Sequence, residues 1–318
     1  MKNRYEMGDF LEDVLCKKLI ATFQDEKLML EGPKNIRINV ADNITVDIEQ
    51  LGIRVVTIVS ENEISFRELY AIFTKIERLL MIFDGRFINL KELSFEESAD
   101  GALEHLKSYA YNLMNSRLSY YNSADFCNYK LDKLIGFESV ITSEIYGTWT
   151  ELLDELDIMH QMFLYSVSDS RMPIDAKCAF LIELAEPLVE VVKIHTHLYS
   201  SLTPGERGTS LKMCVDALIS KYGTLIFQKE IANNYDKFLQ VVVNSRVRIM
   251  HIKRQQKGIY FDGAESVLYS QKMTLLYRII IFEMLGIDTG LYQESICKLV
   301  NSLDTWNDVL DRFLIKLQ

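Results

Sequence analysis

The stretch "TWTELLDELDIMHQMFLYSV", residues 148–167, marks the point where the hydrophobic pattern of the chain becomes helical. Its apolar residues recur every three or four positions, which is the period of an amphipathic α-helix. Thr148 precedes Glu151 by three residues, a spacing typical of a capping box at a helix N-terminus. The stretch therefore predicts that an all-α part of the chain begins near residue 148.

Short apolar runs rich in β-branched residues fill residues 18–60. Turn signals such as "EGPKN" and "ADN" separate them. Runs of this length and composition predict antiparallel strands, which we expect to form a sandwich or a barrel-like sheet. The runs are "LIATF" (19–23), "KLMLEG" (27–32), "NIRINV" (35–40), "NITVDI" (43–48) and "IRVVTIV" (53–59).

A helix is expected after these strands, over "ISFRELYAIFTKIERLLMIFDG" (64–85), because its apolar residues fall at helical spacing. Gly85 is placed to close this helix. "RFINL" (86–90) predicts a further strand. The Tyr-rich segment 104–145 fits either helix or strand, and we expect strands there.

Helical patterns continue after residue 167. Pro187 is expected to kink or split the pattern over 173–202. Further helices are expected over 203–223, from about Ile231 to Gln256, and over 262–286, where Asp262 and Glu265 have capping-box spacing and Gly286 ends the helix. Residues 291–317 predict one or two final helices.

The fold class that follows is α+β. A β-rich N-terminal domain, residues 1–147, precedes an all-α helical bundle, residues 148–318.

The composition is that of a globular protein, with 48% hydrophobic and 25% charged residues in 318. No apolar run approaches the roughly 18 residues that span a bilayer, and acids occupy the region where a signal peptide has its apolar stretch. The five cysteines are far apart and form no CxxC pair. We therefore expect a cytoplasmic protein with reduced cysteines, no membrane contact and no structural zinc.

Basic residues gather in one segment of this acidic chain, whose formal net charge is -10. Residues 237–261 contain six Lys or Arg and no Asp or Glu, and they include "VVVNSRVRIMHIKRQQKG" (241–258). A protein that coats nucleic acid over its whole surface is normally basic. Any contact with a polyanion is therefore expected to be local, at this segment.

Arg246 and His251 could together support RNA cleavage without a metal. A neutral imidazole can take the proton of a ribose 2′-hydroxyl, and a guanidinium can hold the phosphate. On a continuous helix the two residues are about 140° apart, so they are neighbours at a helix edge, whereas Asn244, Arg248 and His251 share one face more closely. One helix supplies one base, so a complete site needs a second copy of the chain.

The segments "VVVNSRVRIMH" (241–251) and "GAESVLYSQKMTLLYRIIIFEMLGI" (263–287), behind a β-rich front, resemble the Apea-like HEPN proteins of bacteria. The resemblance covers roughly residues 148–290. It implies a helical bundle that dimerises and carries an R-x4–6-H motif. Many members are metal-independent endoribonucleases of anti-phage, toxin or abortive-infection systems.

The resemblance makes Arg246 and His251 the catalytic motif pair. Asn244, Arg248, Lys253, Arg254 and Lys257 are then expected to guide RNA. It also implies a homodimer and no metal or other cofactor. The N-terminal domain is expected to sense a trigger, such as a phage component or a host protein.

Two alternatives stay open. The position after the motif arginine is usually polar in the family, whereas this chain has Val247, which favours a non-catalytic HEPN-like module that binds RNA, a nucleotide or a protein. The basic residues near His251 could also be an ordinary solvated helix end, since cations are favoured at a helix C-terminus.

Overall fold

The computed structural model describes residues 15–24, 28, 32–85, 90–97, 133–167, 172–195, 210–251, 258–305 and 307–318. Contacts between Cα atoms divide the chain into two compact units. The first contains the described residues of Met1–Asn128 together with Gly136–Glu151, and the second contains those of Tyr129–Ile135 and Leu152–Gln318. The domain boundary expected between residues 147 and 148 stays a prediction.

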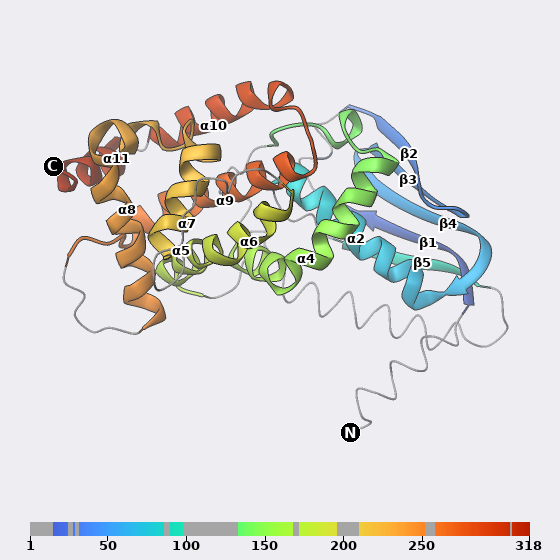
Figure 1. Cartoon of the computed structure of the whole chain (residues 1–318). Helices are drawn as coiled ribbons and strands as arrows, with labels where there is room; N and C mark the ends of the chain where they lie inside the picture. The colour runs from blue at the N-terminus through green and yellow to red at the C-terminus, as the bar shows by residue number, and fades with distance from the viewer. Residues whose placement is uncertain are drawn as a thin grey trace. The chain divides into compact units, whose positions relative to one another are not determined.

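The first unit is built on a five-stranded antiparallel sheet with the strand order β2-β3-β4-β1-β5 (Figure 1). Four of the predicted strands are confirmed, and the expected strand at 27–32 lies almost entirely outside the described residues. Of the strand expected at 86–90, only Leu90 is described, and it begins β5. The strands are β1 (Leu15–Phe23), β2 (Lys34–Ala41), β3 (Ile44–Leu51), β4 (Ile53–Ser65) and β5 (Leu90–Glu97).

The sheet is open, so the expectation of a sandwich or barrel is wrong for the described residues. β2 and β5 are its two edges. A helix, α2 (Phe66–Asp84), packs on β1 and β4, as Figure 1 shows. In β3, buried and more exposed side chains alternate, because one face of the strand lies against the core. Helix α2 thus covers the buried face of the sheet, where the expected sandwich would have a second sheet.

The ends of α2 follow from single residues. The Ser65 hydroxyl accepts a hydrogen bond from the Glu68 amide at 3.2 Å, which caps the N-terminus. Gly85 has a left-handed conformation, with φ of 66°, and its amide donates to the Met81 carbonyl. The predicted closure of this helix at Gly85 is confirmed.

Residues 133–145 contain no strand, so this part of the expected 104–145 strand region is wrong, and residues 104–132 lie outside the described residues. A short 3-10 helix, η3 (Phe137–Ser139), is followed by α4 (Ser143–Val167). Because α4 begins five residues before Thr148, Thr148 lies inside the helix and is not its cap. The Thr142 hydroxyl instead accepts from the Ile145 amide at 3.2 Å.

The second unit is helical. Its described elements after α4 are α5 (Ile174–Glu183), α6 (Ala185–His195), α7 (Leu211–Leu218), the π-helical turn η5 (Ile219–Gly223), α8 (Gln228–Met250), α9 (Ala264–Met284), η6 (Thr289–Leu291), α10 (Gln293–Asp304) and α11 (Asn307–Lys316). The split expected near Pro187 is confirmed, since α5 and α6 meet at Leu184 and Pro187 falls in the first turn of α6.

Helix α9 is the core of this unit. Nearly all of its residues are buried, and α5, α6 and α11 pack against it. It ends as predicted at Gly286, where φ is 72° and Ile287 donates to Phe282 across the end of the helix. The capping box predicted at its start is wrong, because Gly263 is the N-cap and no side chain caps the helix.

A buried ion cluster joins α8, α9 and α10. The Lys272 ammonium has no solvent exposure and lies 2.7 Å from Glu230 and 3.0 Å from Asp304. The Tyr269 hydroxyl donates to the same Glu230 oxygen at 3.0 Å. This cluster fixes the first turn of α8 against α9.

Helix α8 has a break at Asn234, whose φ and ψ of −157° and 86° are not helical. The Asn234 side chain accepts from the Lys237 amide and donates to the Leu317 carbonyl, so it caps a new helical segment. This segment ends at Met250, because His251 leaves helical geometry with φ of −100° and ψ of 6°. Residues 252–256 of the expected helix lie outside the described residues.

Candidate functional site

Arg246 is held by a carboxylate that the sequence analysis did not single out. Its Nη2 donates to Oε1 of Glu183 at 2.8 Å, and its Nε donates to Oε2 of the same residue. Glu183 ends α5, and the Arg246 side chain is 19% exposed. The hydrogen bond to Glu183 raises the pKa of Arg246, so the guanidinium stays charged.

Arg246 also contacts His251, the other residue of the predicted pair. Its Nη1 lies 3.2 Å from Nε2 of His251. A guanidinium has only donors, so Nε2 must accept in this hydrogen bond, and the proton of the neutral imidazole then lies on Nδ1. The two side chains meet directly because His251 has left the helix, which removes the separation of an ideal helix.

Arg248 faces a different set of partners. Its Cζ lies 4.2 Å from the ring centroid of Tyr260, and its Nη1 lies 3.2 Å from Oδ1 of Asp262. An oxygen of Asp175 is 3.8 Å from the same nitrogen, and Asp175 also accepts from the Gly263 amide. Asp262 therefore pairs with Arg248 instead of capping α9.

Asn244 and its neighbour Ser245 hold the chain segment that leads into α9. Asn244 donates to the Ile259 carbonyl at 3.0 Å, and the Ser245 hydroxyl accepts from the Phe261 amide at 2.8 Å. Gly258 has φ of 102°, and a Cβ there would come within 3.1 Å of the Asn244 amide nitrogen. Asn244 and Arg248 thus both bind other residues of the same chain. Their expected contacts with RNA stay predictions.

The remaining residues of the predicted set, Lys253, Arg254 and Lys257, lie outside the described residues. The structure thus describes four residues of the predicted set, namely Arg246, His251, Asn244 and Arg248. Of these, the structure brings Arg246 and His251 into direct contact.

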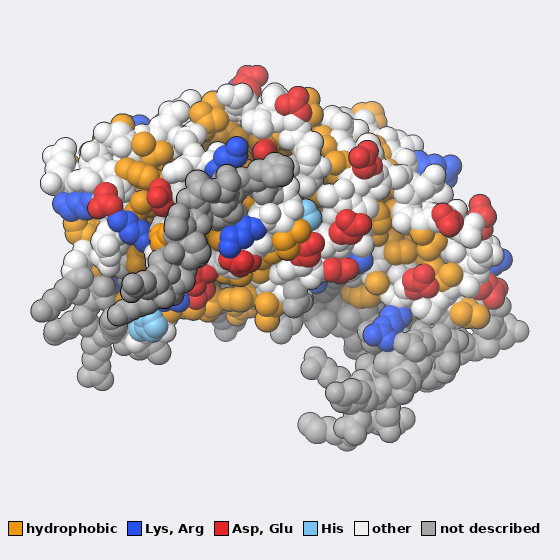
Figure 2. Space-filling model, viewed as in Figure 1, with side chains coloured by type: hydrophobic (Ala, Val, Ile, Leu, Met, Phe, Trp, Pro, Cys, Tyr) orange, Lys and Arg blue, Asp and Glu red, His pale blue; other side chains and the backbone are white. Residues whose placement is uncertain are grey.

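In the part of the chain that the structure describes, carboxylates outnumber cations around the two arginines. Arg246 pairs with Glu183 and feels the field of Glu186, while Arg248 is near Asp175 and Asp262. Figure 2 shows red acidic side chains scattered among blue basic ones over the described part of the face drawn. Among the described residues, both arginines of the motif segment therefore have acidic neighbours.

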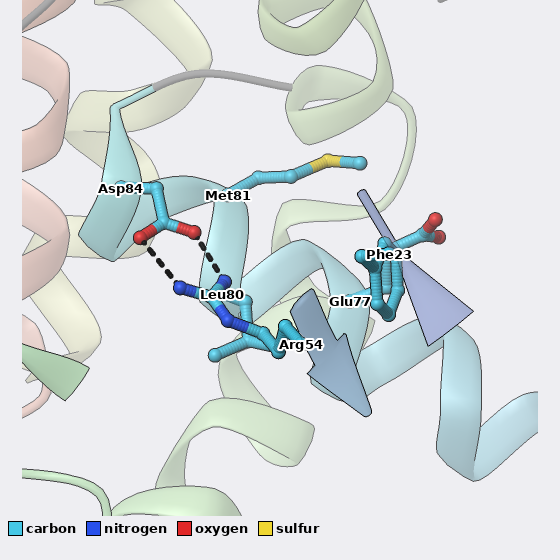
Figure 3. A pocket seen from close by; sticks show the side chains of 6 residues that line it. All are labelled: Phe23, Arg54, Glu77, Leu80, Met81 and Asp84. Carbon is cyan, nitrogen blue, oxygen red and sulfur yellow. Dashed lines mark hydrogen bonds and ion pairs between the residues drawn. The ribbon is translucent and has the colours of Figure 1, made fainter. Parts of the chain in front are cut away.

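A small cavity in the first unit lies beside a buried ion pair. Arg54 on β4 forms a two-pronged ion pair with Asp84 at the end of α2, at 2.5 and 3.1 Å, and donates to Gln50 (Figure 3). Its guanidinium also lies over the ring of Phe137. The cavity beside it is about 10 Å³, room for a single water, so this cluster links the sheet to α2 and is too small for a larger ligand.

Residues 192–291 match the family model of Apea-like HEPN domains. The chain carries an Apea-like HEPN domain. The match contains α7, α8 and α9, and both Arg246 and His251 lie within it. No curated protein and no solved structure matches the chain significantly.

The contact between Glu183 and Arg246 could not be predicted from the sequence. Glu183 precedes the matched segment and is 63 positions from Arg246, so no local spacing links the two. Within the described part of the chain, no helix is both long and apolar enough to cross a membrane.

Proposed function

We propose that the protein is a metal-independent endoribonuclease and that Arg246 and His251 form its cleavage site. His251 would take the proton of a ribose 2′-hydroxyl. The 2′-oxygen would then bond to the adjacent phosphorus, the bond to the 5′-oxygen would break, and that oxygen would gain a proton. Arg246 would hold the phosphate and stabilise its developing charge.

The observation that carries this proposal is the 3.2 Å contact between Nη1 of Arg246 and Nε2 of His251. It joins a phosphate-binding group to an unprotonated ring nitrogen at an exposed position. Two N–H groups of Arg246, one on Nη1 and one on Nη2, stay outside the pairings with Glu183 and His251. When a phosphate binds there, the imidazole would turn from Nη1 to the 2′-hydroxyl, which frees the lone pair of Nε2.

A homodimer would complete the site. One copy supplies one histidine, whereas the reaction needs a base at the 2′-oxygen and an acid at the 5′-oxygen. A second copy related by a two-fold axis would supply the other imidazole. HEPN domains commonly dimerise, which supports this arrangement.

The biological setting is proposed from the family resemblance alone. An anti-phage or toxin role would place the first unit, with its open sheet, as the part that senses a phage or host trigger. Expression of the wild type should then stop bacterial growth, whereas expression of His251→Ala should not.

The direct test is cleavage of labelled RNA by the full chain in EDTA. Arg246→Ala and His251→Ala should each lose cleavage by about a hundredfold or more. Arg37→Ala and His195→Ala are matched controls, because each removes the same side chain from a carboxylate pair elsewhere, with Asp47 and Glu155. Equal cleavage by His251→Ala and wild type would refute the assignment.

A non-catalytic binding module is the second candidate. The observation that favours it is that Glu183, Asp175 and Asp262 already occupy both described arginines of the motif segment. Filter binding of labelled RNA separates the two candidates. Binding that Arg246→Ala weakens, without any product after prolonged incubation, would support the binding module.

A further inference from the structure

We propose that Glu183 is a positioning residue of the Arg246–His251 site. It orients the guanidinium of Arg246 and, through it, the imidazole of His251. The catalytic meaning of this inference rests on the proposed ribonuclease function. The orientation itself can be measured without any reaction.

The first step is the fork between Glu183 and Arg246. Two parallel hydrogen bonds, from Nε and Nη2, hold the planar guanidinium at one edge. The two side chains are 25% and 19% exposed, so water screens the pair less than it screens a surface pair. Helices α5 and α8 pack against each other, which places the end of α5 beside Arg246.

The guanidinium of Arg246 in turn orients the imidazole of His251. Because the group is planar and rigid, fixing Nε and Nη2 also fixes the direction of Nη1. Nη1 then donates to Nε2 of His251 at 3.2 Å. A carboxylate, a guanidinium and an imidazole thus form one chain of contacts in which the first group determines which ring nitrogen of the last is unprotonated. The contact sets the position of the ring in the resting site, and the ring turns its Nε2 lone pair to the 2′-hydroxyl when the substrate binds.

Removal of the negative charge of Glu183 should have a different effect for a positioning role than for a binding or an inhibitory role. A carboxylate beside a phosphate site repels the substrate, so a role in RNA binding alone would favour a neutral residue there. An inhibitory role would make Glu183→Gln more active than wild type. A positioning role predicts a lower kcat with KM unchanged or lower, because the substrate loses a repulsion while the reacting groups lose their alignment.

The test compares Glu183→Gln with Glu183→Asp in the full chain. Glu183→Gln keeps the size and removes the charge, and kcat should fall on the order of a hundredfold. Glu183→Asp restores the charge and should recover part of kcat. Asp47→Asn is the matched control, since Asp47 forms the same kind of fork with Arg37 at 2.6 and 2.7 Å in the first unit. Far-UV circular dichroism checks that each variant is folded.

The second readout is the ¹⁵N spectrum of the histidine rings, with the His251 signals assigned by their loss in His251→Ala. The wild type should show Nδ1 protonated and Nε2 unprotonated at high pH, and Glu183→Gln should show a mixture of the two tautomers, unlike Asp47→Asn. An unchanged His251 spectrum in Glu183→Gln would overturn the proposal, as would undiminished kcat. An inactive wild type whose His251 spectrum responds to Glu183→Gln would refute the ribonuclease function and support the orientation.

Discussion

The buried Lys272 cluster gives the sharpest prediction about stability. In Lys272→Met, the ammonium that faces Glu230 and Asp304 is replaced by an apolar side chain of similar length. Glu230 has no solvent exposure and Asp304 has 12%, so the carboxylates would be left together inside the protein.

The magnitude follows from this burial. Removal of one partner of a buried ion pair costs about 3–5 kcal/mol, because the charge that remains has lost its compensation. The Tyr269 hydroxyl donates to Glu230 at 3.0 Å, and we expect this hydrogen bond to remain in the variant, which places the expected loss near the lower end, at about 3 kcal/mol. The double variant Lys272→Met with Glu230→Gln removes both charges and should lose less than the sum of the two single variants.

Urea denaturation followed by the helical circular dichroism signal measures the free energy of unfolding. Lys298→Met is the control, because Lys298 pairs with Glu294 on the surface of α10, where the two side chains are 74% and 82% exposed. It should leave the denaturation midpoint unchanged. A loss below about 1 kcal/mol in Lys272→Met would refute the argument that the cluster is a buried and mutually dependent set of charges.

Three further predictions concern the same unit. Gly258→Ala forces a side chain into φ of 102° and should cost about 1–3 kcal/mol in urea denaturation, and an unchanged midpoint would contradict the strained backbone. Arg248→Ala removes the stacking on Tyr260 and should lower the unfolding free energy by about 1 kcal/mol, whereas a gain in stability would argue that the cation is held under strain. Burial raises the pKa of Cys178 to about 12, above the thiol pKa of about 8.5 in an unfolded chain. The protonated thiol therefore contributes its full share to the free energy of unfolding below about pH 8.5, and this contribution is lost as the pH rises towards 12. Iodoacetamide at neutral pH should modify the exposed Cys297 before Cys178, and the reverse order by peptide mass spectrometry would contradict the burial.

The parts of the fold that sequence predicts are those set by local pattern. The four strands with alternating β-branched residues, the helix that Gly85 closes and the end of α9 at Gly286 each depend on neighbours within a few positions. Residues 262–265 show where this reasoning fails. Asp262 has the spacing of a cap, but a tertiary pairing with Arg248 takes its side chain.

The site divides in the same way. Arg246 and His251 form a local motif, and their contact follows once the helix ends at Met250. Glu183 belongs to another helix, and its contact with Arg246 depends on how α5 packs against α8. Since packing partners far apart in sequence leave no spacing to read, a single sequence could not reveal this residue.

The central claim is that an imidazole removes the proton of a 2′-hydroxyl with no metal ion required. The most direct measurement uses two oligonucleotides that differ only in the sugar at the position cleaved by wild type. In EDTA, the all-ribose strand should give a 2′,3′-cyclic phosphate and a 5′-hydroxyl by mass spectrometry, and the strand with a single 2′-deoxyribose there should remain intact at that bond. Cleavage of the deoxyribose bond at the same rate would contradict the account.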